Sequence, residues 1–179
     1  MTVSEFSKTF PRLETNRLIL RGIRLDDRYG IFGNFSDEEV AKWFFGEPYS
    51  EIKQADEIIQ AFISEFKEGK GLTWAMTLKG SREFVGTCGY GEVVIGSCGE
   101  IGFDLAKEQW GKGLMSEALS AIIDYGFDSL RLSKVEAHTY STNSRAIRLL
   151  RNLGFQLEDV RDDSHYFALF ARDRRNPEC

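Results

Sequence analysis

The chain has 179 residues, of which 42% are apolar and 28% charged, and its net charge is -5. This length and composition predict one soluble globular domain that spans residues 1–179. No run reaches the about 18 to 20 apolar residues that a membrane helix needs, and the acidic balance argues against a nucleic-acid partner.

Three cysteines, Cys88, Cys98 and Cys179, lie far apart in the sequence, and only two histidines accompany them. Their odd number and the absence of C-x-x-C spacing argue against a disulfide framework and against a bound metal. The first residues have neither the basic start nor the apolar run of a secretory signal. We therefore expect a cytoplasmic protein without a metal or a membrane partner, either a monomer or a homodimer.

The first part of the chain is predicted to hold one strand and three helices. The β-branched run at 17–24 predicts a strand. Apolar residues recur at three- and four-residue steps around 31–35 and 40–44, which indicates two short helices. An amphipathic stripe over 53–67, ended by a glycine at 69, predicts a longer helix.

The remainder of the chain changes from strands to alternating helices and strands. Short β-prone runs at 72–78, 84–94 and 101–105 are separated by glycine turns, as in an antiparallel meander. The apolar pattern over 114–128 predicts a helix that packs on the sheet. The last predicted elements are a strand at 134–139, a helix at 143–153, and strands at 155–160 and 166–171. This order predicts a mixed α/β fold with a mostly antiparallel central sheet flanked by helices.

A glycine-containing loop, Trp110-Gly111-Lys112-Gly113, joins the predicted strand at 101–105 to the helix at 114–128. The start of a helix presents unpaired N-H groups and partial positive charge, and glycines let a bulky anion approach these groups. A pyrophosphate fits such a place, and Lys112 adds charge. The alternative is a turn that only reverses the chain.

Two other nucleotide-binding loops were compared with this one. A Walker A loop is excluded because Ala106 occupies its first glycine position and Gly113 follows the lysine where Ser or Thr is needed. A dinucleotide fingerprint accepts Gly111 and Gly113, with Ser116 third and Glu136 as the later acidic residue. It remains a weaker alternative, because such a domain begins with this unit in a parallel sheet.

Five separated segments follow one another in a characteristic order: Glu100–Leu105, Trp110–Leu119, Val135–Ala137, Asn143–Leu150 and Leu153–Phe155. This order resembles the GNAT superfamily, and more narrowly its RimJ/RimL branch, whose usual beginning is similar to the segment Leu13–Arg21. The resemblance implies an acetyl-CoA-dependent N-acetyltransferase that acts on a primary amine of a protein N-terminus or of a small molecule. It also implies fourth and fifth strands that splay apart around the cofactor.

The resemblance assigns residues to the cofactor and to the acceptor. Backbone groups of Phe103, Asp104 and Leu105 are expected to bind the pantetheine arm. The amides expected to bind the pyrophosphate belong to Trp110, Gly111, Lys112, Gly113, Leu114, Met115 and Ser116. Asn143 is expected to hydrogen-bond the pantetheine, although a simple helix cap is the alternative. The residues expected to line the acceptor pocket are Trp43, Phe44 and Tyr49, with core packing as the alternative for part of this group.

The general acid of many family members has no counterpart here. The positions that hold Tyr or Ser in those members, seven and three residues after the Asn, are Leu150 and Ala146 in this chain. A noncatalytic acyl-CoA-binding sensor is therefore kept as an alternative to the enzyme.

Candidates for the base that deprotonates the amine come from two strands. Glu100 and Asp104 share a face of a regular strand, unless a bulge lies between them, so both are predicted to be catalytic and Glu100 is favoured as the base. The alternative for Glu100 is an exposed strand-edge carboxylate. His138 has a suitable unperturbed pKa, but a structural role is the alternative for a single strand histidine.

Overall fold

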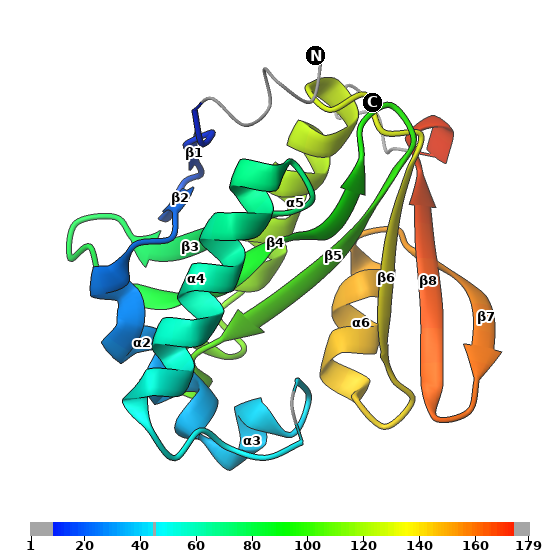
Figure 1. Ribbon diagram of the computed structural model, residues 1–179. Helices are drawn as coiled ribbons and strands as arrows, with labels where there is room; N and C mark the ends of the chain where they lie inside the picture. The colour runs from blue at the N-terminus through cyan, green and yellow to red at the C-terminus, as the bar shows by residue number, and fades with distance from the viewer. Residues whose placement is uncertain (1–8, 45, 174–179) are drawn as a thin grey trace.

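The centre of the protein is an eight-stranded sheet with the strand order β1-β2-β3-β4-β5-β6-β8-β7 (Figure 1). The structure is a computed structural model that describes residues 9–44 and 46–173, so Cys179 lies outside the described residues. The strands are β1 (Leu13–Glu14), β2 (Leu18–Gly22), β3 (Leu72–Leu78), β4 (Phe84–Val94), β5 (Cys98–Leu105), β6 (Lys134–Tyr140), β7 (Gln156–Arg161) and β8 (Ser164–Phe170). Only β5 and β6 pair in parallel among these strands, which confirms the predicted mixed, mostly antiparallel sheet.

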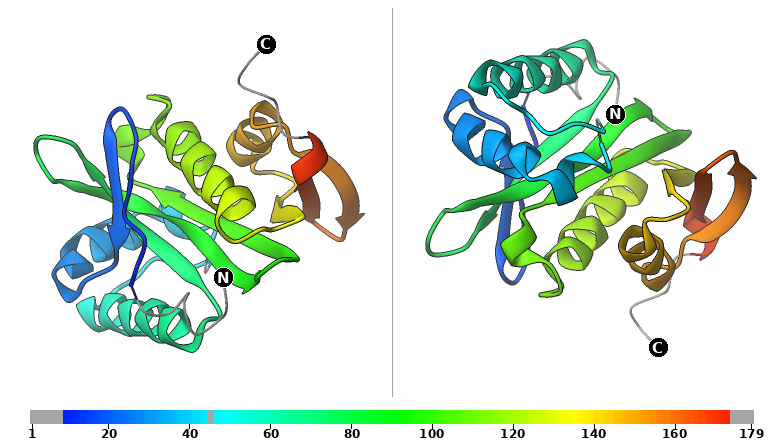
Figure 2. Two further views of the ribbon diagram at one scale, coloured as in Figure 1. Left: turned by 90° about the horizontal axis from the view of Figure 1, so that it is seen from above. Right: turned by 90° about the horizontal axis from the view of Figure 1, so that it is seen from below.

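Helices cover both faces of the sheet. The α-helices are α2 (Arg28–Ser36), α3 (Glu38–Ala41), α4 (Ile52–Glu68), α5 (Leu114–Asp128) and α6 (Ser144–Asn152), and short 3-10 turns are η1 (Leu25–Asp27), η2 (Lys107–Gln109) and η3 (Ala171–Asp173). The views from above and below place α2 and α4 on one face and α5 and α6 on the other (Figure 2). The sheet therefore separates the helix pair α2 and α4 from the pair α5 and α6.

Among the differences from the predicted boundaries, two concern the strands β1 and β5. Strand β1 was not predicted, since two residues are too few to show a strand period. Strand β5 begins at Cys98 instead of Ile101, because its first residues pair with the β-branched end of β4, where Val94 lies opposite Cys98. Residues with weak intrinsic strand preference are thus extended by their neighbours in the sheet.

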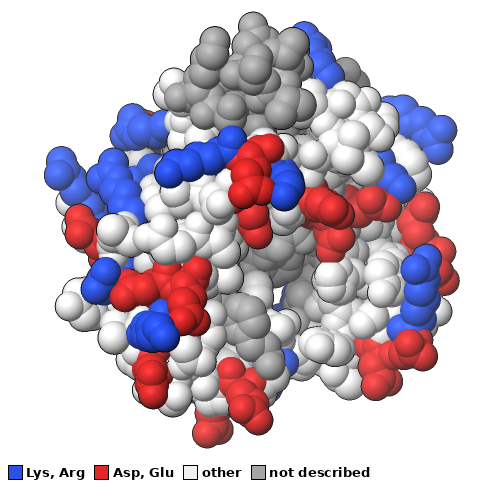
Figure 3. Space-filling view, in the orientation of Figure 1, with Lys and Arg blue, Asp and Glu red and all other residues white. Residues whose placement is uncertain are grey.

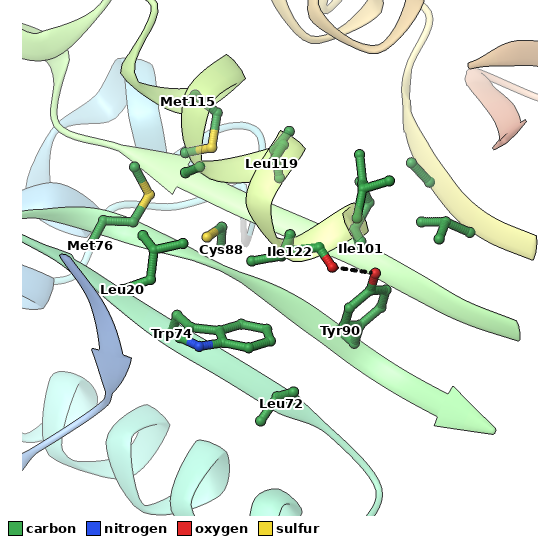
Figure 4. Close-up of a cluster of buried hydrophobic side chains, with 14 of the residues drawn as sticks. Leu20, Leu72, Trp74, Met76, Cys88, Tyr90, Ile101, Met115, Leu119 and Ile122 are labelled. Carbon is green, nitrogen blue, oxygen red and sulfur yellow. Dashed lines mark hydrogen bonds between the residues drawn. The ribbon is translucent and has the colours of Figure 1, made fainter. Parts of the chain in front are cut away.

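Large apolar side chains fill the space between the sheet and α5. Trp74 and Tyr90 are fully buried there, and the Tyr90 hydroxyl donates a 2.9 Å hydrogen bond to the carbonyl oxygen of Ile122 (Figure 4). A smaller cluster around Ile31, Phe35 and Ile59 fills the opposite face. Burial of this apolar surface fixes α5, whose first turn follows the glycine loop.

We expect Gly126→Ala to destabilise the protein, although alanine normally favours a helix by about 1 kcal/mol. A Cβ at position 126 would lie 2.1 Å from the buried Tyr90 hydroxyl oxygen. The resulting overpacking is expected to lower the free energy of unfolding by about 1 to 2 kcal/mol. Gly33→Ala in α2 is the matched control, since nothing lies within 4 Å of a Cβ there. Urea denaturation should show loss for the first variant and a small gain for the second, and equal effects would contradict the expectation.

Strands β5 and β6 pair only over their first residues. Cys98, Gly99 and Glu100 align with residues 134–136, and no further pairs follow although both strands continue. The strands diverge beyond Glu100, as Figure 1 shows. Because β1 is an additional short strand, β5 and β6 are the fourth and fifth strands of the prediction, and their splay is confirmed.

Candidate functional site

A cavity of about 550 Å³ lies where the splayed strands leave an opening. The end of β5, the glycine loop, the start of α5 and one side of α6 form its walls. The cavity brings together all but one of the residues that the resemblance assigned to a cofactor. These are Phe103, Asp104, Leu105, Trp110, Gly111, Gly113, Leu114, Met115, Ser116 and Asn143, and Lys112 is not among the lining residues.

The glycine loop has the backbone geometry of an anion cradle. Gly111 and Gly113 have φ angles of 74° and 75°, a left-handed conformation that other residues adopt only with strain. Gly113 is the N-cap of α5 and provides no side chain to the first amides of the helix. Nothing lies within 4 Å of a Cβ built on Gly111, so the space beside the loop is open. A pyrophosphate fits these N-H groups and this space.

The segment between β1 and β2 contacts the glycine loop and the first turn of α5. Arg17 Nη1 donates a 2.7 Å hydrogen bond to the carbonyl oxygen of Lys112. The backbone N and the Nε of Arg17 each donate a 2.7 Å hydrogen bond to the carboxylate of Glu117, which also accepts one from the Thr15 hydroxyl. Sequence reasoning missed this network, because these groups are about 100 positions apart and only the family resemblance drew attention to the segment around Arg17.

Trp110 connects the loop to β5 and α6. Its indole Nε1 donates a 2.8 Å hydrogen bond to the carbonyl oxygen of Leu105, and the Arg145 guanidinium lies 4.4 Å from its ring centroid. The indole of Trp110 therefore holds the loop against β5 and α6 through contacts that a residue without an indole ring would not make. Lys112 is exposed, and its Nζ donates a 3.1 Å hydrogen bond to the side chain of Gln109.

A second cavity of about 760 Å³ continues the first one towards the α4 side of the splay. Five residues line both cavities: Trp43, Phe44, Phe103, Asn143 and Ala146. The two spaces therefore meet between β5 and β6. A hollow near the middle of the face drawn in Figure 3 has Asp and Glu side chains on its upper border.

The predicted acceptor-lining aromatic residues have different surroundings. Trp43 and Phe44 line both cavities, and the Trp43 ring lies 6.3 Å from that of Tyr140 at the end of β6. Tyr49 packs against Phe35, with ring centroids 5.3 Å apart. Trp43 and Phe44 thus lie beside both cavities, whereas Tyr49 packs against α2 and lines neither.

Asn143 lies at the junction of the two cavities and begins α6. Its side-chain oxygen accepts a 3.2 Å hydrogen bond from the Ala146 amide, which is the cap that the sequence offered as an alternative. The cap uses only the oxygen, so the side-chain NH₂ keeps its two donors. A capping role and a cofactor contact are therefore compatible.

Glu100 and His138 form a hydrogen-bonded pair across the start of the splay. Nδ1 of His138 bonds the carboxylate of Glu100, and both side chains line the second cavity. This hydrogen bond raises the pKa of His138 above its usual value and lowers the pKa of Glu100. Sequence reasoning considered each residue alone, because nothing local in the sequence reveals that the two are adjacent.

Asp104 lies inside the protein on the α2 side of β5. It is 4% exposed, and its carboxylate accepts hydrogen bonds from the Thr87 amide and hydroxyl and from the side chain of Asn34 at 2.9 Å. Burial raises the pKa of Asp104 to about 6, and the hydrogen bonds from Thr87 and Asn34 oppose that shift. The register between β4 and β5 shifts between Tyr90 and Glu92. The bulge therefore lies in β4 and does not interrupt β5 between Glu100 and Asp104.

The sequence matches the acetyltransferase (GNAT) domain over residues 17–156. The chain belongs to the GNAT acetyltransferase family. Uncharacterized N-acetyltransferase YoaA of Bacillus subtilis (strain 168) is 38% identical over 152 residues, which cover 84% of this chain and 86% of that protein. The ribosomal protein uS5-alanine N-acetyltransferase of Escherichia coli (strain K12) is 26% identical over 162 residues, covering 85% of this chain and 81% of the relative. These similarities confirm the RimJ/RimL-like resemblance.

The fold of this GNAT protein is also found among solved structures. Mycobacterium smegmatis RimJ in complex with CoA-disulfide superposes with a TM-score of 0.80 at 20% identity, over 95% of this chain and 91% of that chain. A dinucleotide-binding sheet is excluded, because strands β2 to β5 form an antiparallel ladder. Within residues 9–44 and 46–173, no helix has the length and apolar character needed to cross a bilayer.

The positions without a matched proton donor have clear structural roles in this GNAT protein. Leu150 is fully buried in the main core, and Ala146 is buried at the wall of both cavities. Neither side chain supplies a proton to a leaving thiolate. Any proton that reaches the sulfur must therefore come from another group or from the reacting amine.

Proposed function

We propose that the protein transfers the acetyl group of acetyl-CoA to a primary amine by direct attack of the amine on the thioester. The observation that carries this proposal is the pair of cavities that meet in the splay of β5 and β6, one beside an open helix start and the other beside Glu100 and His138. Family membership supports the reaction type. Direct attack needs no covalent enzyme intermediate.

The residues of the first cavity fit the cofactor. We propose that the amides from Trp110 to Ser116 bind the pyrophosphate, because they lie at the start of a helix of 15 residues and beside open space. Backbone groups of residues 103–105 and the NH₂ of Asn143 are proposed to hold the pantetheine arm. The thioester supplies an activated acyl group, so the chain has to orient this group and provide a route for the protons. We propose that no metal takes part.

The second cavity is proposed to receive the amine. Trp43 and Phe44 offer apolar surface, and the carboxylates of Glu65, Glu92 and Glu100 lie on its walls. A protonated amine is favoured by such surroundings. A protein N-terminus and a small-molecule amine are both candidate acceptors, and the E. coli relative is named for an alanine of ribosomal protein uS5. We infer a cytoplasmic setting and a monomer or homodimer.

The test combines binding and turnover. Calorimetry with acetyl-CoA, CoA and NAD should show affinity for the first two and none for NAD. Release of free thiol should then be followed with a panel of peptides bearing different N-terminal residues, polyamines and other primary amines. Turnover with one of these acceptors is expected. Tight acetyl-CoA binding without turnover on every acceptor would instead favour a sensor, and absence of binding would exclude both.

A further inference from the structure

A hydrogen bond connects the two strands at the point where they begin to diverge. Glu100 is the last residue of β5 that aligns with β6, opposite Glu136. His138 follows on β6, and its Nδ1 bonds the Glu100 carboxylate. Both residues line the second cavity, which shares Phe103 and Asn143 with the first cavity. The pair thus lies beside the place where an amine and a thioester come together.

The hydrogen bond decides which imidazole nitrogen is available. An ionised carboxylate only accepts hydrogen bonds, so Nδ1 of His138 carries the hydrogen and Nε2 keeps its lone pair in the neutral ring. No hydrogen bond to Nε2 is found within the described part of the chain. The side chains of His138 and Glu100 are 54% and 43% exposed, so an incoming substrate can reach them.

We propose that His138 is the general base of acetyl transfer and that Glu100 is a positioning residue that fixes its tautomer. This inference rests on the proposed function. Nε2 takes one proton from the acceptor ammonium, and the freed lone pair forms the C-N bond with the acetyl carbonyl carbon. The C-S bond breaks, a second proton passes from the nitrogen to the departing thiolate, and His138 later releases its proton to water. The amide and the free thiol account for all atoms.

This route agrees with the absence of a matched general acid. Leu150 is in the core and Ala146 has no proton to give. Because the amine nitrogen itself carries the proton that the sulfur needs, only a base has to be provided by the chain. The sequence favoured Glu100 as this base, and its hydrogen bond to His138 now assigns it to positioning.

Charged and aromatic groups of the neighbouring strands surround His138. On its own strand, Glu136 is engaged by Lys134 at 2.7 Å. On β8 the Tyr166 ring stacks on the imidazole with centroids 5.8 Å apart, and the Arg161 guanidinium of β7 lies 4.8 Å from the Tyr166 ring. Lys134 is thus paired with Glu136, and Arg161 lies against the ring of Tyr166.

Groups from β4 and α4 complete these surroundings. Glu92 aligns with Glu100 on the neighbouring strand. Glu65 and Lys70, at the end of α4, line the same cavity, and Lys70 is paired with Glu68 at 2.6 Å. The hydrogen bond that His138 donates to Glu100 is the main cause that raises the pKa of His138. Removing that carboxylate should therefore lower the pKa.

The first experiment compares His138→Gln with the parent enzyme on the best acceptor found. Loss of a general base is expected to lower kcat by about 100-fold. The Kd for acetyl-CoA should stay unchanged, because His138 is not part of the cofactor cavity. His138→Asn serves as a second variant if the first fails to fold. An unchanged kcat in a folded variant would overturn the proposal, whereas lost acetyl-CoA binding by the parent would reject the proposed function itself.

The second experiment measures the positioning role of Glu100. The kcat of the parent should rise with pH as His138 loses its proton, and Glu100→Gln should move this limb to lower pH. Removal of this carboxylate also favours the neutral form of an amine bound in the second cavity, so the imidazole itself is titrated without an acceptor. NMR titration of the imidazole should show the same downward change in the pKa of His138.

Matched variants separate this role from general effects of charge. Glu136→Gln removes a carboxylate from the aligned position on β6, and His165→Gln removes the other histidine and assigns the two imidazole signals. Both should keep the parental pH profile. If Glu100→Gln leaves the His138 pKa and the limb of kcat in place, or if Glu136→Gln moves them equally, Glu100 has no positioning role.

Discussion

Replacing Gly111 with alanine is expected to raise the Kd for acetyl-CoA by about 10- to 100-fold. The new Cβ would occupy the open space beside the helix start, where the pyrophosphate is proposed to lie. The φ of 74° also costs an L-residue about 1 to 2 kcal/mol, which lowers the stability of the variant. Calorimetry at fixed pH and salt measures the change directly.

Gly80 provides a matched control for the backbone strain. It also has a positive φ, of 92°, and nothing lies within 4 Å of a Cβ built on it, but it belongs to the turn between β3 and β4. Gly80→Ala should lower stability as much as Gly111→Ala and leave the Kd unaltered. If Gly111→Ala keeps the parental Kd, the loop does not bind the cofactor.

Asp104→Asn is expected to stabilise the protein by about 2 to 3 kcal/mol at pH 8. The pKa of Asp104 is about 6 in the folded protein, above the ordinary aspartate value of 3.8, because burial disfavours its charge. The folded state therefore holds a proton that the unfolded chain has lost, and this contribution to stability disappears as pH rises through 6. An asparagine remains neutral and can keep partners at Thr87 and Asn34.

The difference between variant and parent identifies the group, since other residues titrate in both proteins. The gain should be small at about pH 4, grow mainly between about pH 4 and 6 and stay constant above about pH 7, as measured by urea denaturation. Asp163→Asn, at an exposed position between β7 and β8, is the control variant. A destabilised Asp104→Asn at pH 8 would mean that the ionised carboxylate is needed by its hydrogen-bond partners.

Local sequence patterns predicted most of the fold. The apolar stripe of α4 and the continuous apolar run of α5 have clear helical periods, and each was placed within one or two residues. Strand β1 was not predicted, because its extended conformation depends on pairing with β2. Patterns that repeat within an element can be recognised locally, while pairing between distant residues cannot.

The same distinction holds for the site. The glycine loop was recognised because a short segment contains both the glycines and the helix start. The hydrogen bond between Glu100 and His138 depends on which strands are neighbours, and the burial of Asp104 depends on α2, where Asn34 lies. The sequence indicated the right residue types and left their partners to tertiary structure.

The network that joins Arg17 and Glu117 bears on how the cofactor cradle is assembled. These residues are 100 positions apart, so their contact closes a large loop of chain, and the entropy of that closure opposes early formation. The hydrogen bond from Arg17 to the loop at Lys112 therefore forms only when the N-terminal segment has docked on α5. A cradle that looks like a short local motif is completed by long-range folding.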